Sequence, residues 1–231
     1  VNADGTLAGL YTFKDLERMF GRPQEGDDVK RYTLDKNGCL RVAAAIGVGG
    51  AGLERLSLLA RYNLDVVVVD SSHGNSKNVI QTVIDAKRRF PEIAVIAGNV
   101  AEADGTERLI RAGADAVKIG IGGGSICTTR KASGAGVPQV TAVYECYNVA
   151  EKYNIPVISD GGIVNHGDFP LAIAAGADCI MMGKYLAGTD EAPGEVIQTA
   201  KGQKKLYRGM GSRSAMSQAG SRDRYFVPDG T

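Results

Sequence analysis

The chain has 231 residues, of which 44% are hydrophobic, and this is enough for one large domain or two small ones with a buried core. Lys and Arg number 27 against 26 Asp and Glu, so net charge gives no reason to invoke a nucleic acid or a membrane surface. No apolar run approaches the roughly 18 residues of a membrane span, and the four cysteines are scattered without a CxxC pair, which indicates reduced thiols in a cytoplasmic protein.

Short apolar runs alternate with amphipathic segments along most of the chain. The apolar runs predict strands at residues 40–48, 65–70, 93–100, 116–122, 156–162 and 179–185. Helical spacing of apolar residues predicts helices between them, at residues 53–63, 78–90, 101–114, 141–154 and 168–177. Two of these units repeat, as RAGADAVKIG and AAGADCIMMG, each with a Gly suited to end a helix. Because the strands are apolar without alternation, we expect both of their faces to be buried, as in a parallel sheet.

This alternation predicts an α/β fold, either a (β/α)8 TIM barrel or a doubly wound sheet. Glycine or a polar residue stands at the end of the predicted strands, at Gly47, Asp70, Asn99, Gly120, Asp160 and Gly183. A barrel gathers its active site at the carboxyl ends of all its strands, whereas a doubly wound sheet concentrates it at one switch point. The sequence therefore favours the barrel, represented by about six β-α units.

The beginning of the chain has a different pattern. Residues 1–20 read as strand, turn, strand and helix, and residues 21–38 form a polar linker rich in Gly and Asp. The six predicted strands do not close an eight-stranded barrel. We therefore expect a partial protein, with the end of an accessory domain in residues 1–20, a linker in 21–38, and a catalytic barrel portion in 39–231 that ends in an active-site flap.

The segment IGIGGGSICTTR, residues 119–130, places a cysteine just after a glycine-rich loop. Such a loop can bring backbone groups close to a phosphate or a cation, and it does not match the GxGxxG pattern of a dinucleotide fold. Arg130 follows Cys127 closely, and a neighbouring cation favours the nucleophilic thiolate. We therefore expect Cys127 to be a nucleophile and interpret the other three cysteines as structural, namely Cys39, Cys146 and Cys179.

Two further loops follow the last two predicted strands, SDGG and the pair Gly183-Lys184. In (β/α)8 barrels the loops after strands seven and eight often form a phosphate site. The backbone N–H groups of Gly162 and Gly183 and the charge of Lys184 suit that role. Asp160 suits the two hydroxyls of a ribose. His73 lies near the same mouth, and because it has no visible partner we interpret it as structural rather than catalytic.

Residues 201–231 carry seven basic and two acidic residues. This tail is either a solvated basic loop or an anion-binding one. It does not favour nucleic acid, because aromatic stacking platforms are not interleaved with its basic residues. Arg224 and Tyr225 read as part of a flap, in which an Arg desolvated against a Tyr can serve as a base.

Five motifs in combination, GGGSICTTR, SDGGI, AGTDEAPGE, YRGMGS and DRYF, resemble those of the IMP dehydrogenase and GMP reductase family. The resemblance covers nearly the whole chain. The opening DGTLAGLYTFKDL is similar to the end of the paired CBS module that this family inserts into its barrel. The resemblance implies that the family's first two strands precede this module and that a further segment follows the flap.

The resemblance also implies an activity, the oxidation of IMP to XMP with NAD in guanine nucleotide biosynthesis. Cys127 would attack C2 of the purine, and the resulting thioimidate would be hydrolysed by a water activated by Thr129, Arg224 and Tyr225. The implied substrate contacts are Ser125, Gly162, Gly183, Lys184 and Tyr207 at the phosphate, Asp160 at the ribose, and Met210 and Gly211 at the base. The implied cofactor contacts are Asp70, Ser71, Asn99 and Gly120, and a potassium ion would be bound by the backbone carbonyls of Gly122, Gly124 and Cys127. Members of the family form homotetramers.

The chain departs from the family pattern at Gly123, where Pro or Ser is common, and at Lys184, where Ser is common. GMP reductases, which deaminate GMP with NADPH, share CTTRK and SDGG, and the DRYF motif favours the dehydrogenase because the reductase has no such Arg-Tyr pair. A non-catalytic nucleotide-binding barrel is a third interpretation. It is disfavoured because a pure binder needs none of the four residues Cys127, Thr129, Arg224 and Tyr225.

Overall fold

The computed structural model describes residues 34–35, 38–210, 212, 215 and 217. The chain divides into two compact units, Val1–Val42 and Ala43–Thr231. In the first unit, Leu34 forms an antiparallel bridge with Leu40. The predicted accessory segment 1–20 and most of the predicted linker 21–38 lie outside the described residues. So do three predicted site residues, Gly211, Arg224 and Tyr225.

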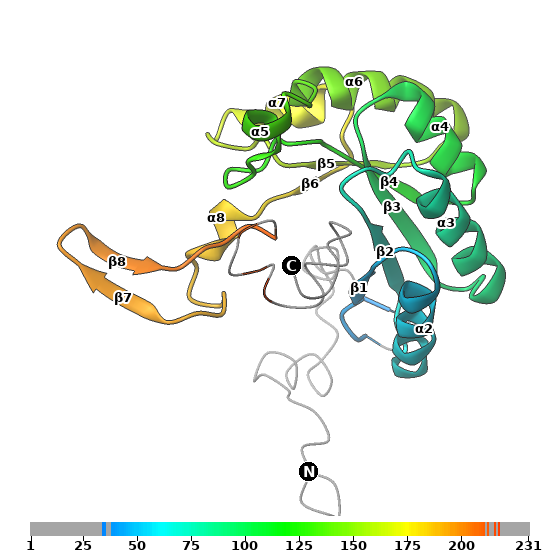
Figure 1. Cartoon of the computed structure of the whole chain (residues 1–231), viewed down its shortest axis with the longest axis horizontal. Helices are drawn as coiled ribbons and strands as arrows, with labels where there is room; N and C mark the ends of the chain where they lie inside the picture. The colour runs from blue at the N-terminus through cyan, green and yellow to red at the C-terminus, as the bar shows by residue number, and fades with distance from the viewer. Residues whose placement is uncertain (1–33, 36–37, 211, 213–214, 216, 218–231) are drawn as a thin grey trace, which may run out of the picture. The chain divides into compact units, whose positions relative to one another are not determined.

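The second unit is built on a parallel sheet of six strands. The strands are β1 (Ala43–Ile46), β2 (Val66–Asp70), β3 (Ala94–Val100), β4 (Ala116–Ile119), β5 (Val157–Asp160) and β6 (Cys179–Met181). Each strand pairs with its neighbours in the sequence, in the order β1-β2-β3-β4-β5-β6. A doubly wound sheet would reverse this order at its switch point. The sequential order, in a sheet that curls along its length (Figure 1), confirms the barrel type of fold.

Helices between the strands cover the outer side of the curved sheet (Figure 1). They are α2 (Gly50–Leu59), α3 (Lys77–Arg89), α4 (Ala103–Arg111), α6 (Gln139–Ala150) and α7 (Asp168–Ala174), with short 3-10 turns η2 (Ala60–Tyr62) and η3 (Glu151–Tyr153). Ser76 caps the start of α3 by accepting a hydrogen bond from the Val79 N–H. None of the described helices is long and apolar enough to span a bilayer.

The repeated GAD motif has a structural reason in both of its copies. Gly113 and Gly176 have φ angles of 101° and 108°, the left-handed conformation that ends α4 and α7. The Asp two residues later accepts a hydrogen bond from the first part of the neighbouring strand: Asp115 from the Val95 N–H at 2.7 Å and Asp178 from the Val157 N–H at 2.8 Å. The motif therefore ends a helix and fixes the next strand beside its neighbour.

The hydrophobic core lies between the sheet and its helices. Fully buried side chains come from both layers, among them Leu56, Val67, Val69, Val83, Val95, Leu109, Val117, Val143 and Val157. Only β4 is buried along its whole length, whereas β2 alternates between buried and half-buried residues. The prediction of burial on both faces is therefore wrong for β2 and also for β1, β5 and β6, which contain exposed or half-buried residues, because the described helices cover only the outer face of the curved sheet.

The cysteines that were interpreted as structural fall into two groups. Cys146 is buried in α6, and its burial raises the pKa of the thiol to about 11. Cys39 and Cys179 are exposed. The structural interpretation thus fits Cys146, whose thiol stays protonated at neutral pH, and gives no packing role to the other two.

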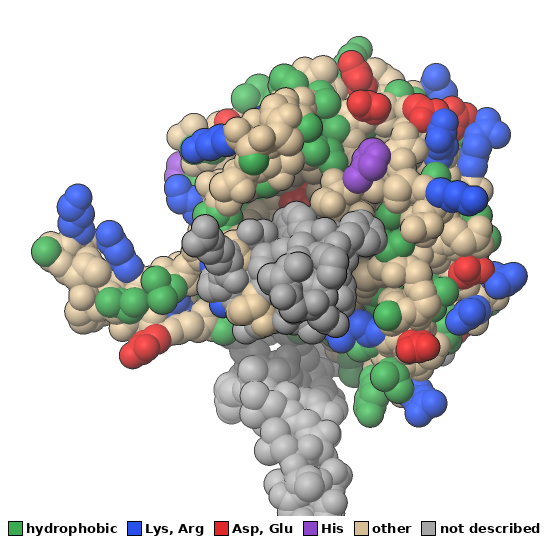
Figure 2. Space-filling model, in the orientation of Figure 1, with side chains coloured by type: hydrophobic (Ala, Val, Ile, Leu, Met, Phe, Trp, Pro, Cys, Tyr) green, Lys and Arg blue, Asp and Glu red, His purple; other side chains and the backbone are tan. Residues whose placement is uncertain are grey.

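The region after β6 differs from the sequence prediction. The predicted strand 179–185 ends at Met181, and Lys184 begins a short helix, α8 (Lys184–Ala187). An antiparallel hairpin follows, formed by β7 (Val196–Thr199) and β8 (Gly202–Lys205), which the sequence did not predict. This hairpin projects from the sheet and carries basic side chains (Figures 1 and 2).

Candidate active site

A buried lysine connects the carboxyl ends of four strands. Lys118 on β4 is 3% exposed, and its Nζ donates to Asp160 Oδ2 on β5 at 2.7 Å and to Asp70 Oδ1 on β2 at 3.2 Å. It also donates to Asn99 Oδ1 on β3. The strand ends predicted to share one mouth are thus joined through a single ammonium group. Because two carboxylates surround one cation, this cluster carries a net negative charge.

Asn99 completes this cluster. The register of β3 against β4 shifts between Gly98 and Val100, which places Asn99 at an irregularity of the kind that re-aims a side chain. Its Nδ2 donates to Asp160 Oδ2 at 2.9 Å and to the Gly120 carbonyl at 2.7 Å. Four of the predicted contacts, Asp70, Asn99, Gly120 and Asp160, are therefore brought together.

Sequence reasoning missed Lys118, although a signal was present. A lysine inside the apolar run AVKIG is a charge in a buried strand, and a buried charge requires partners. Gln139, at the start of α6, was also missed. Its Nε2 donates to the Ile119 carbonyl at 2.9 Å and to Ser159 Oγ at 3.1 Å, so it holds β4 and β5 together below the site.

The loops after β4 and β5 touch each other. A Cβ on Gly120 would lie 2.1 Å from the Asp160 carbonyl oxygen, so only glycine fits at this position. Gly161 and Gly162 both have positive φ angles, and the Gly162 N–H donates to the Gly123 carbonyl at 3.0 Å. The Gly162 N–H, predicted to bind a phosphate, is therefore already engaged and becomes available only if this loop moves.

Cys127 lies in the loop after β4 with a partly exposed thiol. Its Sγ lies 3.3 Å from Thr129 Oγ1, within hydrogen-bond distance, and Thr129 begins the short helix α5 (Thr129–Ser133). The Arg130 guanidinium donates to the carbonyls of Ile121 and Val137. Arg130 thus braces the loop, and the contacts of the described residues do not pair it with Cys127 as the sequence suggested.

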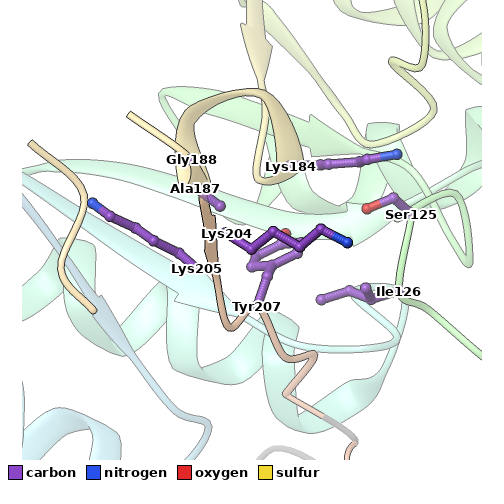
Figure 3. A pocket seen from close by; sticks show the side chains of 8 residues that line it. All are labelled: Ser125, Ile126, Lys184, Ala187, Gly188, Lys204, Lys205 and Tyr207. Atoms are coloured by element: carbon purple, nitrogen blue, oxygen red, sulfur yellow. The ribbon is translucent and has the colours of Figure 1, made fainter. Parts of the chain in front are cut away.

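Residues of this loop line two pockets. One, of about 360 Å³, is here called the basic pocket and is lined by Ser125, Ile126, Lys184, Ala187, Gly188, Lys204, Lys205 and Tyr207 (Figure 3). The other, of about 410 Å³, is called the Thr129 pocket and is lined by residues of three loops and the start of α4, including Ser72, His73, Val100, Gly105, Thr129 and Gly136. The loop that carries the thiol therefore contributes residues to two ligand-sized spaces.

The Tyr207 side chain occupies space in the basic pocket that is open because residue 183 is a glycine. A Cβ on Gly183 would lie 2.0 Å from the Tyr207 hydroxyl oxygen. The hydroxyl therefore lies directly against the backbone at the start of α8. Gly183, Tyr207, Ser125 and Lys184 are four of the five predicted phosphate contacts, and they meet around this pocket.

We expect the substitution Gly183→Ala to displace the Tyr207 hydroxyl without unfolding the protein, because the displaced atom is the end of a mobile side chain. Affinity for inorganic phosphate, measured by calorimetry, should fall about tenfold through loss of one hydrogen bond to a charged group. Gly167→Ala is the matched control, because a Cβ there meets no atom within 4 Å. Equal phosphate affinity in the two variants would contradict this role of Gly183.

The remaining predicted contacts have different surroundings. Ser71 is buried, and its Oγ accepts a hydrogen bond from the His73 N–H at 3.2 Å, so it shapes the loop after β2. Met210 is 48% exposed. His73 lines the Thr129 pocket, as its predicted position near the site suggested.

The predicted potassium and NAD contacts can be tested against the donor groups present. The carbonyl oxygens of Gly122 and Cys127 accept no hydrogen bond from the described residues, whereas that of Gly124 accepts one from the Cys127 N–H at 2.9 Å. Backbone carbonyl oxygens are ligands that suit a hard cation such as potassium. Among described residues no cluster of His, Cys, Asp and Glu forms an alternative metal site. The Thr129 pocket and the polar groups beside it suit the nicotinamide and ribose half of a dinucleotide.

Comparisons with known proteins show the family to which the chain belongs. A family described as "IMP dehydrogenase / GMP reductase domain" matches residues 5–231. Inosine-5'-monophosphate dehydrogenase of Aquifex aeolicus is 50% identical over 100% of this chain and 47% of its own length. The enzymes of the same name from Chlorobaculum parvum and Bacillus subtilis are 49% and 46% identical, over 98% and 100% of this chain and 44% and 47% of their own lengths. The chain thus spans about half the length of the curated relatives it matches.

A solved structure is also similar. It is a cysteine-to-alanine variant of GMP reductase from Trypanosoma brucei in complex with guanosine 5'-monophosphate. The TM-score is 0.82 at 41% sequence identity, over 94% of this chain and 44% of that one.

Proposed function

Because the chain belongs to the IMP dehydrogenase / GMP reductase domain family, we propose that it carries the catalytic centre of an enzyme that oxidises IMP to XMP with NAD, in guanine nucleotide biosynthesis. One observation carries the proposal. The loop bearing Cys127 supplies Ser125 and Ile126 to the basic pocket and ends at Thr129, which lines the Thr129 pocket, so a nucleotide and a dinucleotide bound in these pockets could meet near the thiol. The relatives named as dehydrogenases favour this direction of chemistry over reduction.

The substrate binds across the basic pocket and the Lys118 cluster. Its phosphate oxygens accept hydrogen bonds from the hydroxyls of Ser125 and Tyr207 and from the ammonium group of Lys184. The ribose hydroxyls donate to Asp160, whose carboxylate is held in place by Lys118 and Asn99. The N–H groups of Gly162 and Gly183 at the phosphate, and Met210 and Gly211 at the base, are the further contacts that the motifs suggest.

Cys127 performs the covalent step. Its thiolate sulfur bonds to C2 of the purine, and the hydrogen on C2 departs as a hydride, which leaves a thioimidate. NAD, when bound, supplies the hydride acceptor, and it would be held by Asp70, Ser71, Asn99 and Gly120 beside the Thr129 pocket.

Hydrolysis then releases the product. A water oxygen bonds to C2, the C2–S bond breaks, and the sulfur departs as the thiolate, so that IMP, water and NAD yield XMP, NADH and a proton. Thr129 is suited to accept a hydrogen bond from this water, because its hydroxyl lies 3.3 Å from the sulfur, and it can take up the proton of the water only by passing its own hydroxyl proton to a neighbouring base. Arg224 and Tyr225, which lie outside the described residues, are proposed to assist.

Several wider features belong to the same proposal. Potassium would be held by the carbonyls of Gly122, Gly124 and Cys127, where it would stiffen the loop that carries the thiol. Residues 1–20 would be the end of a CBS module, residues 21–38 its linker, and residues 39–231 the catalytic barrel portion with its flap. The protein would act in the cytoplasm as a homotetramer.

A paired absorbance assay on the full-length protein, with potassium present, tests the activity. The likeness to a GMP reductase structure makes reduction of GMP the second candidate. One reaction contains IMP and NAD, and the other contains GMP and NADPH. We expect NADH to form in the first. Consumption of NADPH in the second, with the first silent, would establish the reductase, and silence in both would reduce the site to a nucleotide-binding barrel.

A further inference from the structure

We infer that Lys204 is a further specificity-determining residue of the basic pocket, which together with Lys184 forms a two-cation site for a dianionic 5'-phosphate. This inference rests on the proposed function, since it assigns the phosphate of that substrate. It adds a residue from the β7–β8 hairpin, which none of the motifs includes. It also predicts which ligands gain nothing from Lys204, namely nucleosides without a phosphate.

The side chains of Lys204 and Lys205, which are adjacent in β8, point in opposite directions. Lys205 Nζ donates to the carbonyls of Thr189 and Ala192, at 2.7 Å each, and this anchors the hairpin to the segment after α8. Because successive side chains of a strand point to opposite sides, Lys204 extends the other way. Figure 3 shows its side chain reaching past Tyr207 toward Ser125 and Ile126, while that of Lys205 points away.

Four polar groups of this pocket have no partner among the described residues. Neither Lys184 nor Lys204 forms an ion pair or a side-chain hydrogen bond with any described residue, and the same holds for the hydroxyls of Ser125 and Tyr207. Among the described residues that line the pocket, none is acidic. Two ammonium groups and two hydroxyls that face one space without an anion are a set of donors suited to a phosphate.

Two cations at one phosphate should distinguish its charge states. A phosphate ester loses its second proton near pH 6. Because each ammonium group attracts the dianion more strongly than the monoanion, affinity should rise as pH rises through about 6. Removal of Lys204 should make this rise smaller. A lysine that is merely solvated on the hairpin would not alter it.

The test compares Lys204→Met with Lys201→Met in the full-length protein. Lys201 is an exposed lysine in the turn of the same hairpin and does not line the pocket. Calorimetry without cofactor measures the Kd of IMP, of inosine and of inorganic phosphate. We expect Lys204→Met to weaken IMP and phosphate roughly tenfold, as for one partly exposed charged contact. Inosine affinity should not change, Lys201→Met should behave like the unaltered protein, and Lys204→Arg should restore most of the affinity.

Equal IMP and phosphate affinities in Lys204→Met and Lys201→Met would overturn the inference, and so would an equal loss of inosine affinity in Lys204→Met. Failure of the proposed function gives a different result. If the protein turns over neither nucleotide pair, inorganic phosphate still reports on the pocket, and a loss confined to Lys204→Met still supports the two-cation site.

Discussion

Replacing Cys127 with alanine is expected to reduce the turnover of IMP by at least about 10³-fold, because in the proposed mechanism the thiol forms the covalent bond through which both chemical steps proceed. Binding of IMP should stay within a few-fold of the unaltered protein, since the proposed phosphate and ribose contacts are other residues such as Ser125 and Asp160. The rate is measured as NADH absorbance and the affinity by calorimetry. Cys179→Ala, which removes another exposed thiol from β6, is the matched control and should retain turnover.

Alkylation measures the reactivity of the same thiol independently of turnover. Cys127 is partly exposed and Cys146 is buried, with a thiol pKa raised to about 11 by that burial. At neutral pH, iodoacetamide should therefore modify Cys127 and leave Cys146 intact, and IMP should protect Cys127 because it covers the loop. Peptide mass spectrometry identifies the modified residue. Substantial turnover by the Cys127→Ala variant would exclude the covalent mechanism, whatever the labelling pattern.

The strands were predictable because two local features mark each of them. An apolar run identifies the strand, and a glycine or polar residue marks its end, as at Asp70 and Asp160, where β2 and β5 end as predicted. The order of the strands follows from the regular β-α alternation. Burial was less predictable, because whether the inner face of β2 is covered depends on the curvature of the whole sheet, which no local pattern records.

Other elements carry no such local mark. The hairpin of β7 and β8 consists largely of polar residues, VIQT and GQKK, without the alternation that predicts a strand. Its pairing depends instead on a turn that ends at Gly202, with a φ angle of 98°, and on the anchoring of Lys205. The short helix α8 was missed for a similar reason, since four residues are too few to show helical spacing.

The sequence indicated which residues lie at the strand ends of the site, but it did not indicate how their side chains contact one another. Glycines and polar residues at strand ends identified Asp70, Asn99 and Asp160, because these residue types are costly in a strand unless a ligand or partner requires them. The atom that joins them, Lys118 Nζ, comes from the middle of a strand. Only the register of β4 against β3 and β5 brings that ammonium group to the three side chains.

This arrangement makes Lys118 the residue whose loss should affect stability most. We expect Lys118→Met to lower the free energy of unfolding by about 3 kcal/mol, because it leaves Asp70 and Asp160 facing each other without their cation. Urea denaturation measures this change. The same variant should bind IMP more weakly, since Asp160 loses the donor that holds its carboxylate toward the ribose.

A double-mutant cycle separates this charge effect from simple loss of packing. Adding Asp160→Asn to Lys118→Met removes one of the two facing carboxylates, so the double variant should regain part of the stability that Lys118→Met loses. If the stability losses of the two single variants simply add, Lys118 and Asp160 act independently. In that case the lysine only fills space in β4. A positive coupling instead means that Lys118 and Asp160 stabilise the fold as a pair. Because the same ammonium group also donates to Asp70 and Asn99, a disturbance at the proposed ribose contact would then reach the proposed cofactor contacts through one shared donor.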